Sequence, residues 1–174
     1  MKKIAVFGKP GSGKSTLSKA LALAAGIPLY QLDSIMYKPN GELVDRGLFD
    51  EEHARILSSG SWLIDGVGPL SSFNQRLEAA DTLVYVDLPY LTSYWFVTKR
   101  LLKGVVVKPE GWPDGSSVLK GTLASYKVLR LCPNFWNDDF NARLEALSDK
   151  KSLYIVKSVS ELNNFVSRNI ASLY

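Results

Sequence analysis

Two hydrophobic patterns alternate along the chain. Short apolar runs, typical of strands buried on both faces of a parallel sheet, lie at Ile4–Phe7, Leu29–Leu32, Trp62–Gly66, Thr82–Val86 and Leu153–Val156. Between them, longer stretches repeat their apolar residues every three or four positions, which predicts helices with one buried face. Because strands and helices alternate throughout, the pattern predicts an α/β fold with a parallel sheet covered by helices on both faces.

The helical stretches also carry start and stop signals. They are expected at about 14–25, 49–60, 70–80, 90–102, 122–131, 139–147 and 162–170. The first should end at Ala24 or Ala25, since Gly26 is a typical residue for a left-handed helix end. The second should hold Asp50–Glu52 in its first turn, where the helix dipole favours acidic groups. Pro133 is expected to break the fifth.

The turn after the first strand is rich in glycine. It reads Gly-Lys-Pro-Gly-Ser-Gly-Lys-Ser-Thr and fits the phosphate-binding pattern G-x-x-x-x-G-K-S/T, the P-loop. Its glycines permit positive φ angles, so successive backbone N–H groups can point at one anion, and the start of the next helix adds its own. The turn therefore predicts a nucleotide site with contacts from Gly8, Pro10, Gly11, Ser12, Gly13, Lys14, Ser15 and Thr16.

The polar side chains at the end of this loop suit ATP. The Lys14 ammonium can reach the β- and γ-phosphates, and the Ser15 hydroxyl can ligate Mg²⁺. Thr16 can donate a hydrogen bond to the α-phosphate. The alternative is a glycine-rich turn without a ligand, which leaves the positions of Lys14 and Ser15 unexplained. ATP and Mg²⁺ are therefore the expected cofactors, and Lys14 is also a candidate catalytic residue.

Acidic residues follow the predicted strands at the edge where ligands gather in open α/β sheets. Asp33 is a candidate to take a proton from an acceptor hydroxyl or to orient the acceptor, or it caps the next turn. Asp65 is the best-placed carboxylate to hold Mg²⁺ near Ser15, directly or through water; a turn residue is its alternative. Asp87 is expected to be a cap or turn residue, with Mg²⁺ ligation as its alternative.

Two basic residues belong to the region of the second helix. Arg46 lies just before that helix and is a candidate to bind an anionic group of the acceptor, the alternative being a solvated surface charge. His53 is the single histidine and shares a helix face with Phe49 and Ile56. We expect it to be a half-buried core residue rather than a catalytic one.

Composition and charge limit the class of protein. The 174 residues are enough for one domain, 1–174, with a sizeable core. The net charge of +4 suits an anionic small substrate but falls short of a nucleic-acid footprint. Cys132 is the only cysteine, which favours a reducing cytosol. The apolar run at Ile4–Phe7 is too short for a signal peptide, and no stretch could span a membrane, so we expect a cytoplasmic monomer or dimer.

The stretch from Lys103 to Gly121 is punctuated by glycine and proline. Flexible connections of this kind often serve as active-site lids. The helix before it carries the aromatic run Tyr94–Phe96, which we expect to pack internally rather than to stack on nucleic-acid bases.

Several motifs occur in a recognisable order: Gly8–Thr16, Leu32-Asp33, Trp62–Gly66, Arg76-Leu77, Ala80–Thr82, Asp87–Pro89 and Tyr154–Ser158. This order resembles the adenylate-kinase-related P-loop proteins of the DNA topology modulation protein family. The resemblance implies a three-layer P-loop kinase fold, a five-stranded parallel sheet of order 2-3-1-4-5, and ATP with Mg²⁺. It also implies an acceptor-binding segment at about 34–61 and a lid-like segment at about 103–136.

The same resemblance singles out arginines. In adenylate kinases the third strand continues Asp-Gly-Phe-Pro-Arg, and that arginine helps to hold the acceptor phosphate; here Pro69 takes its place. The departure weakens the case for a nucleoside monophosphate as acceptor. Arg76 is a candidate substitute, with an ion pair to Glu78 or Asp81 as its alternative. Arg100, just before the lid, is expected to neutralise the transferring phosphoryl group.

Three functions are compatible with these features. The favoured one is a phosphotransferase that moves the γ-phosphoryl group of ATP to a small acceptor held over Asp33 and Arg46, with Lys14, Mg²⁺ and Arg100 neutralising charge. The second, suggested by the family label, is an ATP-binding or ATP-hydrolysing regulatory protein that modulates DNA topology, supported only by basic residues between 99 and 108. The third is an NTPase that acts on water.

Overall fold

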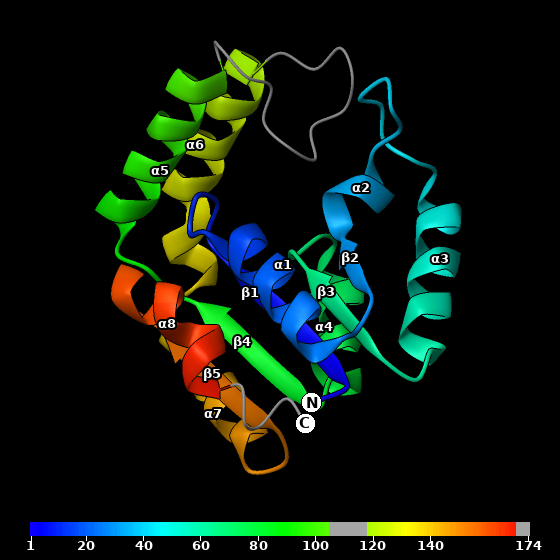
Figure 1. Ribbon diagram of the computed structural model, residues 1–174. Helices are drawn as coiled ribbons and strands as arrows, with labels where there is room; N and C mark the ends of the chain where they lie inside the picture. The colour runs from blue at the N-terminus through cyan, green and yellow to red at the C-terminus, as the bar shows by residue number, and fades with distance from the viewer. Residues whose placement is uncertain (105–117, 170–174) are drawn as a thin grey trace.

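The computed structural model describes residues 1–104 and 118–169 (Figure 1). Within these ranges one sheet has the strand order β2-β3-β1-β4-β5. Its strands are β1 (Lys3–Gly8), β2 (Leu29–Gln31), β3 (Trp62–Asp65), β4 (Thr82–Val86) and β5 (Ser152–Val156). Every pairing between neighbouring strands is parallel. The α/β class and the strand order expected from the sequence are therefore confirmed.

Helices fill the connections between the strands. They are α1 (Lys14–Ala25), α2 (Leu32–Met36), α3 (Arg46–Ser58), α4 (Leu70–Ala79), α5 (Tyr90–Gly104), α6 (Val118–Phe135), α7 (Asp138–Ser148) and α8 (Val159–Asn169). The first ends at Ala25, as its sequence predicts, because Gly26 adopts φ 64° and its N–H bonds back to the last turn. No helix of the described residues is long and apolar enough to cross a membrane.

Successive residues of the central strands serve opposite faces of the sheet, because side chains alternate along a strand. Ile4 and Val6 of β1 pack in a core cluster with buried residues of α1 and α8. Ala5 and Phe7 pack in a second cluster with residues of α3, α4 and α7. The sheet is thus the middle of three layers (Figure 1), which explains why its strands appear as uninterrupted apolar runs.

An aromatic cluster fixes the end of α6 against the sheet. The Trp136 ring lies 5.1 Å from that of Tyr85 and 4.8 Å from that of Phe140, measured between centroids. Phe7 stacks on Tyr85 at 5.5 Å and meets Phe73 edge-on at 5.3 Å. Such pairs stabilise beyond the area they bury. The cluster therefore holds α6 over the carboxyl ends of the strands.

Several element boundaries expected from the sequence are wrong, and α6 and α8 begin earlier than expected, at Val118 and Val159. The second strand ends at Gln31, and Leu32 begins α2, because the buried Leu32 side chain turns into the core cluster around Phe7. The helix α3 starts at Arg46, since the Asp45 carboxylate accepts hydrogen bonds from the N–H groups of the first turn. Asp50–Glu52 therefore lie in the second turn, and the first turn contains no acidic residue.

Pro133 does not end the fifth expected helix, because α6 continues through it to Phe135. Proline inside a helix removes a donor and crowds the preceding turn. Helical hydrogen bonding nevertheless continues past the proline, since the Trp136 N–H donates to the Cys132 carbonyl oxygen at 2.8 Å. The packing of Phe135 and Trp136 in the aromatic cluster supports the continued helix.

Helices α5 and α6 lie side by side (Figure 1), and α6 occupies the later part of the expected lid-like segment. The Tyr94 and Tyr126 rings stack at 5.7 Å, and the hydroxyl groups of Thr98 and Tyr126 share a hydrogen bond of 2.6 Å. The packing role expected for Tyr94 is consistent with this contact. The expectation is wrong for Trp95 of the same aromatic run, which is 58% exposed. The part of the expected lid between 105 and 117 lies outside the described residues.

Candidate active site

Close packing and backbone conformation explain the glycines of Gly8–Thr16, the predicted phosphate-binding loop. Gly11 has φ 68°, and a Cβ atom there would lie 2.5 Å from the Ser93 carbonyl oxygen of α5. Gly13 has φ 81°, and a Cβ atom there would lie 2.6 Å from a methyl group of Leu162 on α8. Residues other than glycine rarely adopt such φ values. The loop is thus clamped between α5 and α8, with the start of α1 directed into a cavity.

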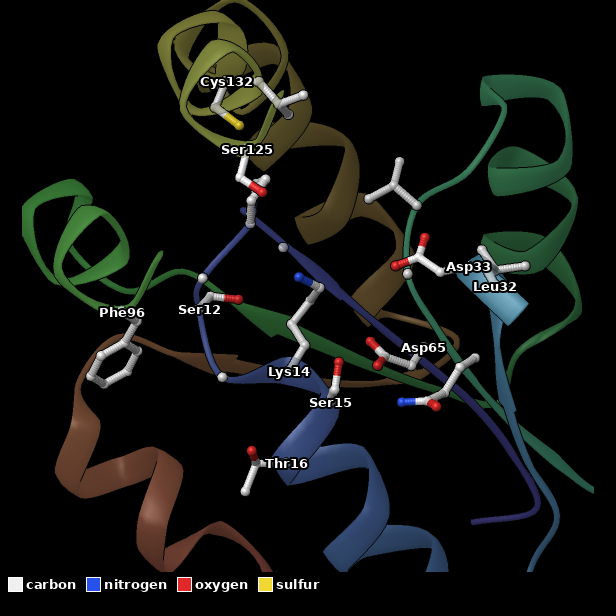
Figure 2. Close-up of a pocket in the computed structure, with 18 of the residues that line it drawn as sticks. Ser12, Lys14, Ser15, Thr16, Leu32, Asp33, Asp65, Phe96, Ser125 and Cys132 are labelled. Carbon is white, nitrogen blue, oxygen red and sulfur yellow. The ribbon is translucent and has the colours of Figure 1, made fainter. Parts of the chain in front are cut away.

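This cavity has a volume of about 890 Å³ and lies at the carboxyl ends of β1, β2 and β3, as expected for ligands of parallel sheets (Figure 2). It brings together residues that are far apart in sequence. The sequence-predicted residues that line it are Gly8, Pro10, Gly11, Ser12, Gly13, Lys14, Ser15, Thr16, Asp33, Asp65 and Arg100.

Lys14 stands among the charged groups of this cavity. Its ammonium donates a 2.9 Å hydrogen bond to the Lys9 carbonyl oxygen of the same loop. Burial lowers the pKa of Lys14, while the negative charges of Asp65 and Asp33 raise it. Figure 2 shows both carboxylates facing the side of the cavity where the Lys14 ammonium lies. Lys14 is therefore held beside two acids and close to where a bound phosphate would replace the carbonyl.

Asp65 has the donor atoms of a magnesium site. It is buried, and burial raises its pKa, while the Lys14 charge and a hydrogen bond from the Ser15 hydroxyl lower it. Its Oδ1 atom is buried without a hydrogen-bond partner among the described residues. Residues 1–104 and 118–169 hold no group of three acidic, cysteine or histidine side chains that could cage a metal. Mg²⁺ ordinarily takes one or two protein oxygens and completes its shell with phosphates and water, and Ser15 and Asp65 fit that arrangement.

Arg100 approaches the cavity from α5. Its Nη2 atom donates a 2.8 Å hydrogen bond to the Ser125 hydroxyl of α6. Burial lowers the pKa of Arg100, and the charge of Asp33 raises it. Asp33 itself lies in the first turn of α2 and is exposed to the cavity. The expected catalytic pair, a carboxylate and an arginine, is thus present in one cavity with Lys14.

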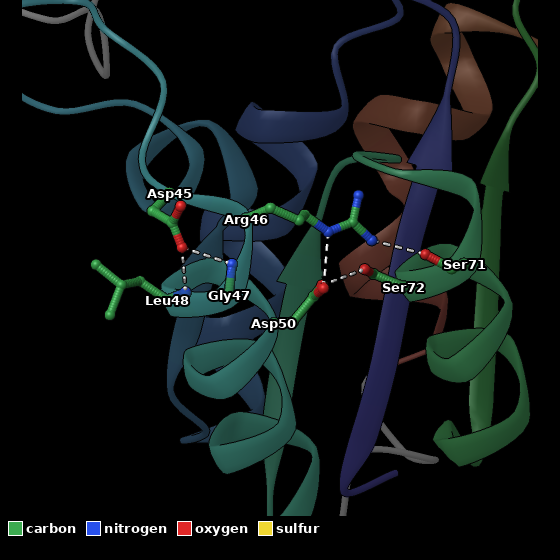
Figure 3. A network of polar contacts seen from close by, with 7 residues as sticks. All are labelled: Asp45, Arg46, Gly47, Leu48, Asp50, Ser71 and Ser72. Atoms are coloured by element: carbon green, nitrogen blue, oxygen red, sulfur yellow. Dashed lines mark hydrogen bonds and ion pairs between the residues drawn. The ribbon is translucent and has the colours of Figure 1, made fainter.

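Arg46 does not line the cavity, and Figure 3 shows its guanidinium directed at Asp50 and Ser71 instead. It is the first residue of α3, and its Nε atom pairs with Asp50 at 2.7 Å. Its Nη2 atom donates to the Ser71 hydroxyl of α4 at 2.7 Å, while Ser72 donates to Asp50 at 3.3 Å. Arg46 therefore links α3 to α4. This position fits the alternative of a surface charge better than the expected contact with an anionic group of the acceptor.

Arg76 is also absent from the cavity lining, although it is buried. Its guanidinium donates to the Val67 carbonyl oxygen, in the loop that follows Asp65. Burial lowers the pKa of Arg76 to about 9, and the charge of Asp65 raises it. The alternative of an ion pair with Glu78 or Asp81 is not seen among the described residues, and the Asp81 carboxylate instead accepts hydrogen bonds from the N–H groups of Lys2 and Lys3. Arg76 therefore supports the loop beneath the cavity.

The expectation that His53 is a core residue agrees with the structure, which buries it more completely than expected. The ring is 1% exposed and stacks on Phe49 at 5.8 Å. Burial lowers the pKa of His53 to about 4, and the nearby charge of Arg76 adds to the effect. His53 is therefore neutral near pH 7 and lies outside the cavity lining.

Sequence reasoning missed a buried ion pair at the base of the loop. Lys9 is 2% exposed, and its ammonium pairs with Asp87 at the end of β4. The same ammonium lies 4.6 Å from the centre of the Tyr90 ring. Position 9 is variable in the motif, and Asp87 was expected to be a cap or turn residue, or alternatively a Mg²⁺ ligand, rather than the partner of a lysine. The one sequence feature that could have indicated the ion pair is the position of Lys9, in a loop between a buried strand and a partly buried helix.

Neither a protein-family model nor a curated protein matches the sequence. Solved structures do match over nearly the whole chain. A shikimate kinase from Acinetobacter baumannii in complex with shikimate has a TM-score of 0.56 at 14% identity and covers 99% of this chain and 92% of its own. A sugar kinase from Janibacter sp. HTCC2649 has a TM-score of 0.52 at 16% identity, covering 98% and 93%.

A gluconokinase from Sinorhizobium meliloti 1021 has a TM-score of 0.51 at 19% identity and covers 99% of this chain and 91% of its own. At these identities the likeness concerns the fold alone. The narrower resemblance to DNA topology modulation proteins is not shown by these comparisons. The described chain, with its strand order β2-β3-β1-β4-β5 and its loop at the end of β1, has the fold of the P-loop kinases.

Proposed function

We propose that this protein is an ATP-dependent phosphotransferase that moves the γ-phosphoryl group of ATP to a small hydroxyl-bearing acceptor. One observation carries the proposal: a phosphate-binding loop, two carboxylates and an arginine from separate elements converge on one cavity of about 890 Å³. Ligand pockets of roughly 300–1,000 Å³ are typical, so the volume suits a nucleotide together with a small second substrate.

The phosphates of ATP would lie on the loop Gly8–Thr16. The backbone N–H groups at the start of α1 face the cavity, and the Lys14 ammonium needs only to leave the Lys9 carbonyl to reach a phosphate oxygen. Ser15 and Asp65 would hold Mg²⁺. When bound, the ion supplies neutralising charge to the β- and γ-phosphates.

Asp33 is the residue that we assign to the acceptor. Its carboxylate would accept a hydrogen bond from the acceptor hydroxyl, fix the oxygen in line with the γ-phosphorus and take its proton. The new bond joins this oxygen to phosphorus, the bond between phosphorus and the β–γ bridging oxygen breaks, and ADP leaves with the electron pair. Arg100 would place positive charge beside the phosphoryl oxygens during transfer. Lys14, Arg100 and Asp33 are thus our candidate catalytic residues.

The structure changes the expected acceptor contacts. Arg46 and Arg76 are engaged with Asp50, Ser71 and the Val67 carbonyl, and neither lines the cavity. We therefore assign both to positioning: Arg46 holds α3 to α4, and Arg76 holds the loop that follows Asp65. The direct acceptor contact that remains from the sequence is Asp33.

The proposal is tested by incubating the protein with γ-labelled ATP, Mg²⁺ and a panel of nucleosides, nucleoside monophosphates, sugars and hydroxy acids. We expect label in one acceptor product and about 100-fold slower transfer in Asp33→Asn. Asp149→Asn, an exposed acid at the end of α7 and outside the cavity, is the matched control. ATP hydrolysis that no acceptor alters would favour a water-directed NTPase. A gel-shift series over salt that showed specific DNA binding would favour the regulatory alternative.

A further inference from the structure

The cavity has a second region whose chemistry differs from that of the phosphate-binding loop. We call it the apolar wall and define it by Met36, Val67, Leu70, Leu131, Phe135 and Trp136. It is built from α2, the loop after β3, the start of α4 and the end of α6. Leu70 is 57% exposed and Leu131 is 54% exposed, although both line the cavity. Exposed aliphatic side chains gathered in a concave site indicate a ligand with an apolar surface.

The wall contains a rigid aromatic platform. The Phe135 and Trp136 rings meet edge-on at 4.6 Å, and Trp136 is fixed from behind by Tyr85 at 5.1 Å. Both residues are only half-buried and line the cavity. A ring anchored in this way offers area to a flat ligand without first losing much conformational freedom.

The charges that line the cavity favour an uncharged acceptor over an anionic one. Among described residues the cations that line it are Lys14 and Arg100, and the acids are Asp33 and Asp65. A magnesium-bound ATP carries a charge of about −2, which the two cations balance. The acid nearest the acceptor, Asp33, repels a second anion, and like-charge contacts weaken binding strongly.

The arginines of the surrounding elements are engaged away from the acceptor side of the cavity, although the charge of Arg76 acts on Asp65 and lowers its pKa. Arg46 pairs with Asp50, Arg76 donates to the Val67 carbonyl, and Arg143 donates to Asn74 at 2.9 Å. None of the three lines the cavity. An anionic acceptor would therefore meet Asp33 and an apolar wall, without a described cation beyond the two at the triphosphate site.

We infer that the acceptor is an uncharged hydroxyl compound with a flat, largely apolar body, of the class that nucleosides represent, and that a phosphate or carboxylate on the same body excludes it. This inference rests on the proposed function. The flat body lies in the corner that the nearly perpendicular rings of Phe135 and Trp136 form, and the hydroxyl reaches Asp33.

The test measures transfer of labelled phosphoryl groups from ATP to matched probes, four nucleosides and their 5′-monophosphates. We expect kcat/KM for the better nucleosides to exceed that of their monophosphates by at least about 10-fold. Leu131→Lys adds a cation to the wall, and we expect it to shift this ratio toward the monophosphate by about 10-fold. Leu123→Lys is the matched control, since Leu123 lies on the same helix, is 59% exposed and does not line the cavity; it should leave the ratio unchanged.

A monophosphate preferred by the unaltered protein would overturn the inference and leave the phosphotransferase intact. An equal shift in Leu131→Lys and Leu123→Lys would also overturn it, because the wall would then not contact the acceptor. Transfer to no nucleoside or monophosphate, together with label in a sugar or hydroxy acid of the wider panel, would overturn the inference and leave the proposed function intact. Label in no acceptor of the whole panel, in a protein that binds ATP, would overturn both.

Discussion

The buried ion pair between Lys9 and Asp87 gives the sharpest test of how the loop is held. The Lys9 ammonium links the loop to the end of β4, and the Lys9 carbonyl oxygen accepts the Lys14 hydrogen bond at 2.9 Å. We expect Lys9→Met, which keeps the length and apolar stem of the side chain, to release the loop from β4. The same change removes the contact of the ammonium with the Tyr90 ring at 4.6 Å.

The expected loss of stability follows from the burial of the two partners. Breaking a fully buried pair costs roughly 3–5 kcal/mol, because the remaining charge is left without a partner. The Asp87 side chain is 32% exposed, so water recovers part of this cost, whereas Lys9 is only 2% exposed. We therefore expect the free energy of unfolding to fall by about 2 kcal/mol, including the lost cation–π contact.

Urea unfolding and titration calorimetry with a magnesium-bound ATP analogue measure the two effects. We expect a lower urea midpoint at constant slope and about 10-fold weaker nucleotide binding, since the loop must be reordered when the nucleotide binds. Lys127→Met, an exposed lysine of α6 outside the cavity, is the control. In the double variant with Asp87→Asn the second change should cost little. Unchanged stability and affinity in Lys9→Met would refute the idea that this pair fixes the loop.

Further expectations concern Mg²⁺, the transferred group and pH. Asp65→Asn should raise the Mg²⁺ concentration for half-maximal activity about 10-fold with a smaller effect on nucleotide affinity; an unaltered Mg²⁺ response would make Asp65 structural. Arg100→Ala should lower kcat about 100-fold with ATP affinity nearly constant, and a normal kcat would remove Arg100 from the chemistry. The pKa of His53 is lowered from 6.5 to about 4 in the folded protein, so as the pH falls the unfolded chain binds a proton before the folded protein does. The free energy of unfolding should therefore fall by about 2 kcal/mol between about pH 6.5 and pH 4. His53→Phe should flatten this part of a urea-midpoint profile, and an identical slope in the variant would contradict the assignment.

Sequence reasoning reached the features that depend on local pattern. The central strands are buried on both faces, so they stand out as apolar runs, and the glycines of the loop are fixed by its backbone conformation. The convergence of Lys14, Asp33 and Asp65 followed because the carboxyl ends of parallel strands meet at one edge of a sheet. The sheet order itself came from the resemblance and not from the pattern.

Features that depend on tertiary packing were not accessible in the same way. Arg46 and Arg76 were assigned by charge and position, yet their partners, Ser71 and the Val67 carbonyl, are set by the docking of α4 on α3 and β1. Pro133 argued for a helix end, but aromatic packing carries α6 past it. The same packing creates the apolar wall, which no local motif marks.

The central claim is that the loop Gly8–Thr16 binds the triphosphate of ATP, and calorimetry on Lys14→Met tests it most directly. The change removes the ammonium and keeps the stem, so thermal unfolding should confirm an intact fold. We expect the unaltered protein to bind a magnesium-bound, non-hydrolysable ATP analogue, and Lys14→Met to bind it about 100-fold more weakly, a loss of about 2.7 kcal/mol. Equal affinity in the two proteins would contradict the claim.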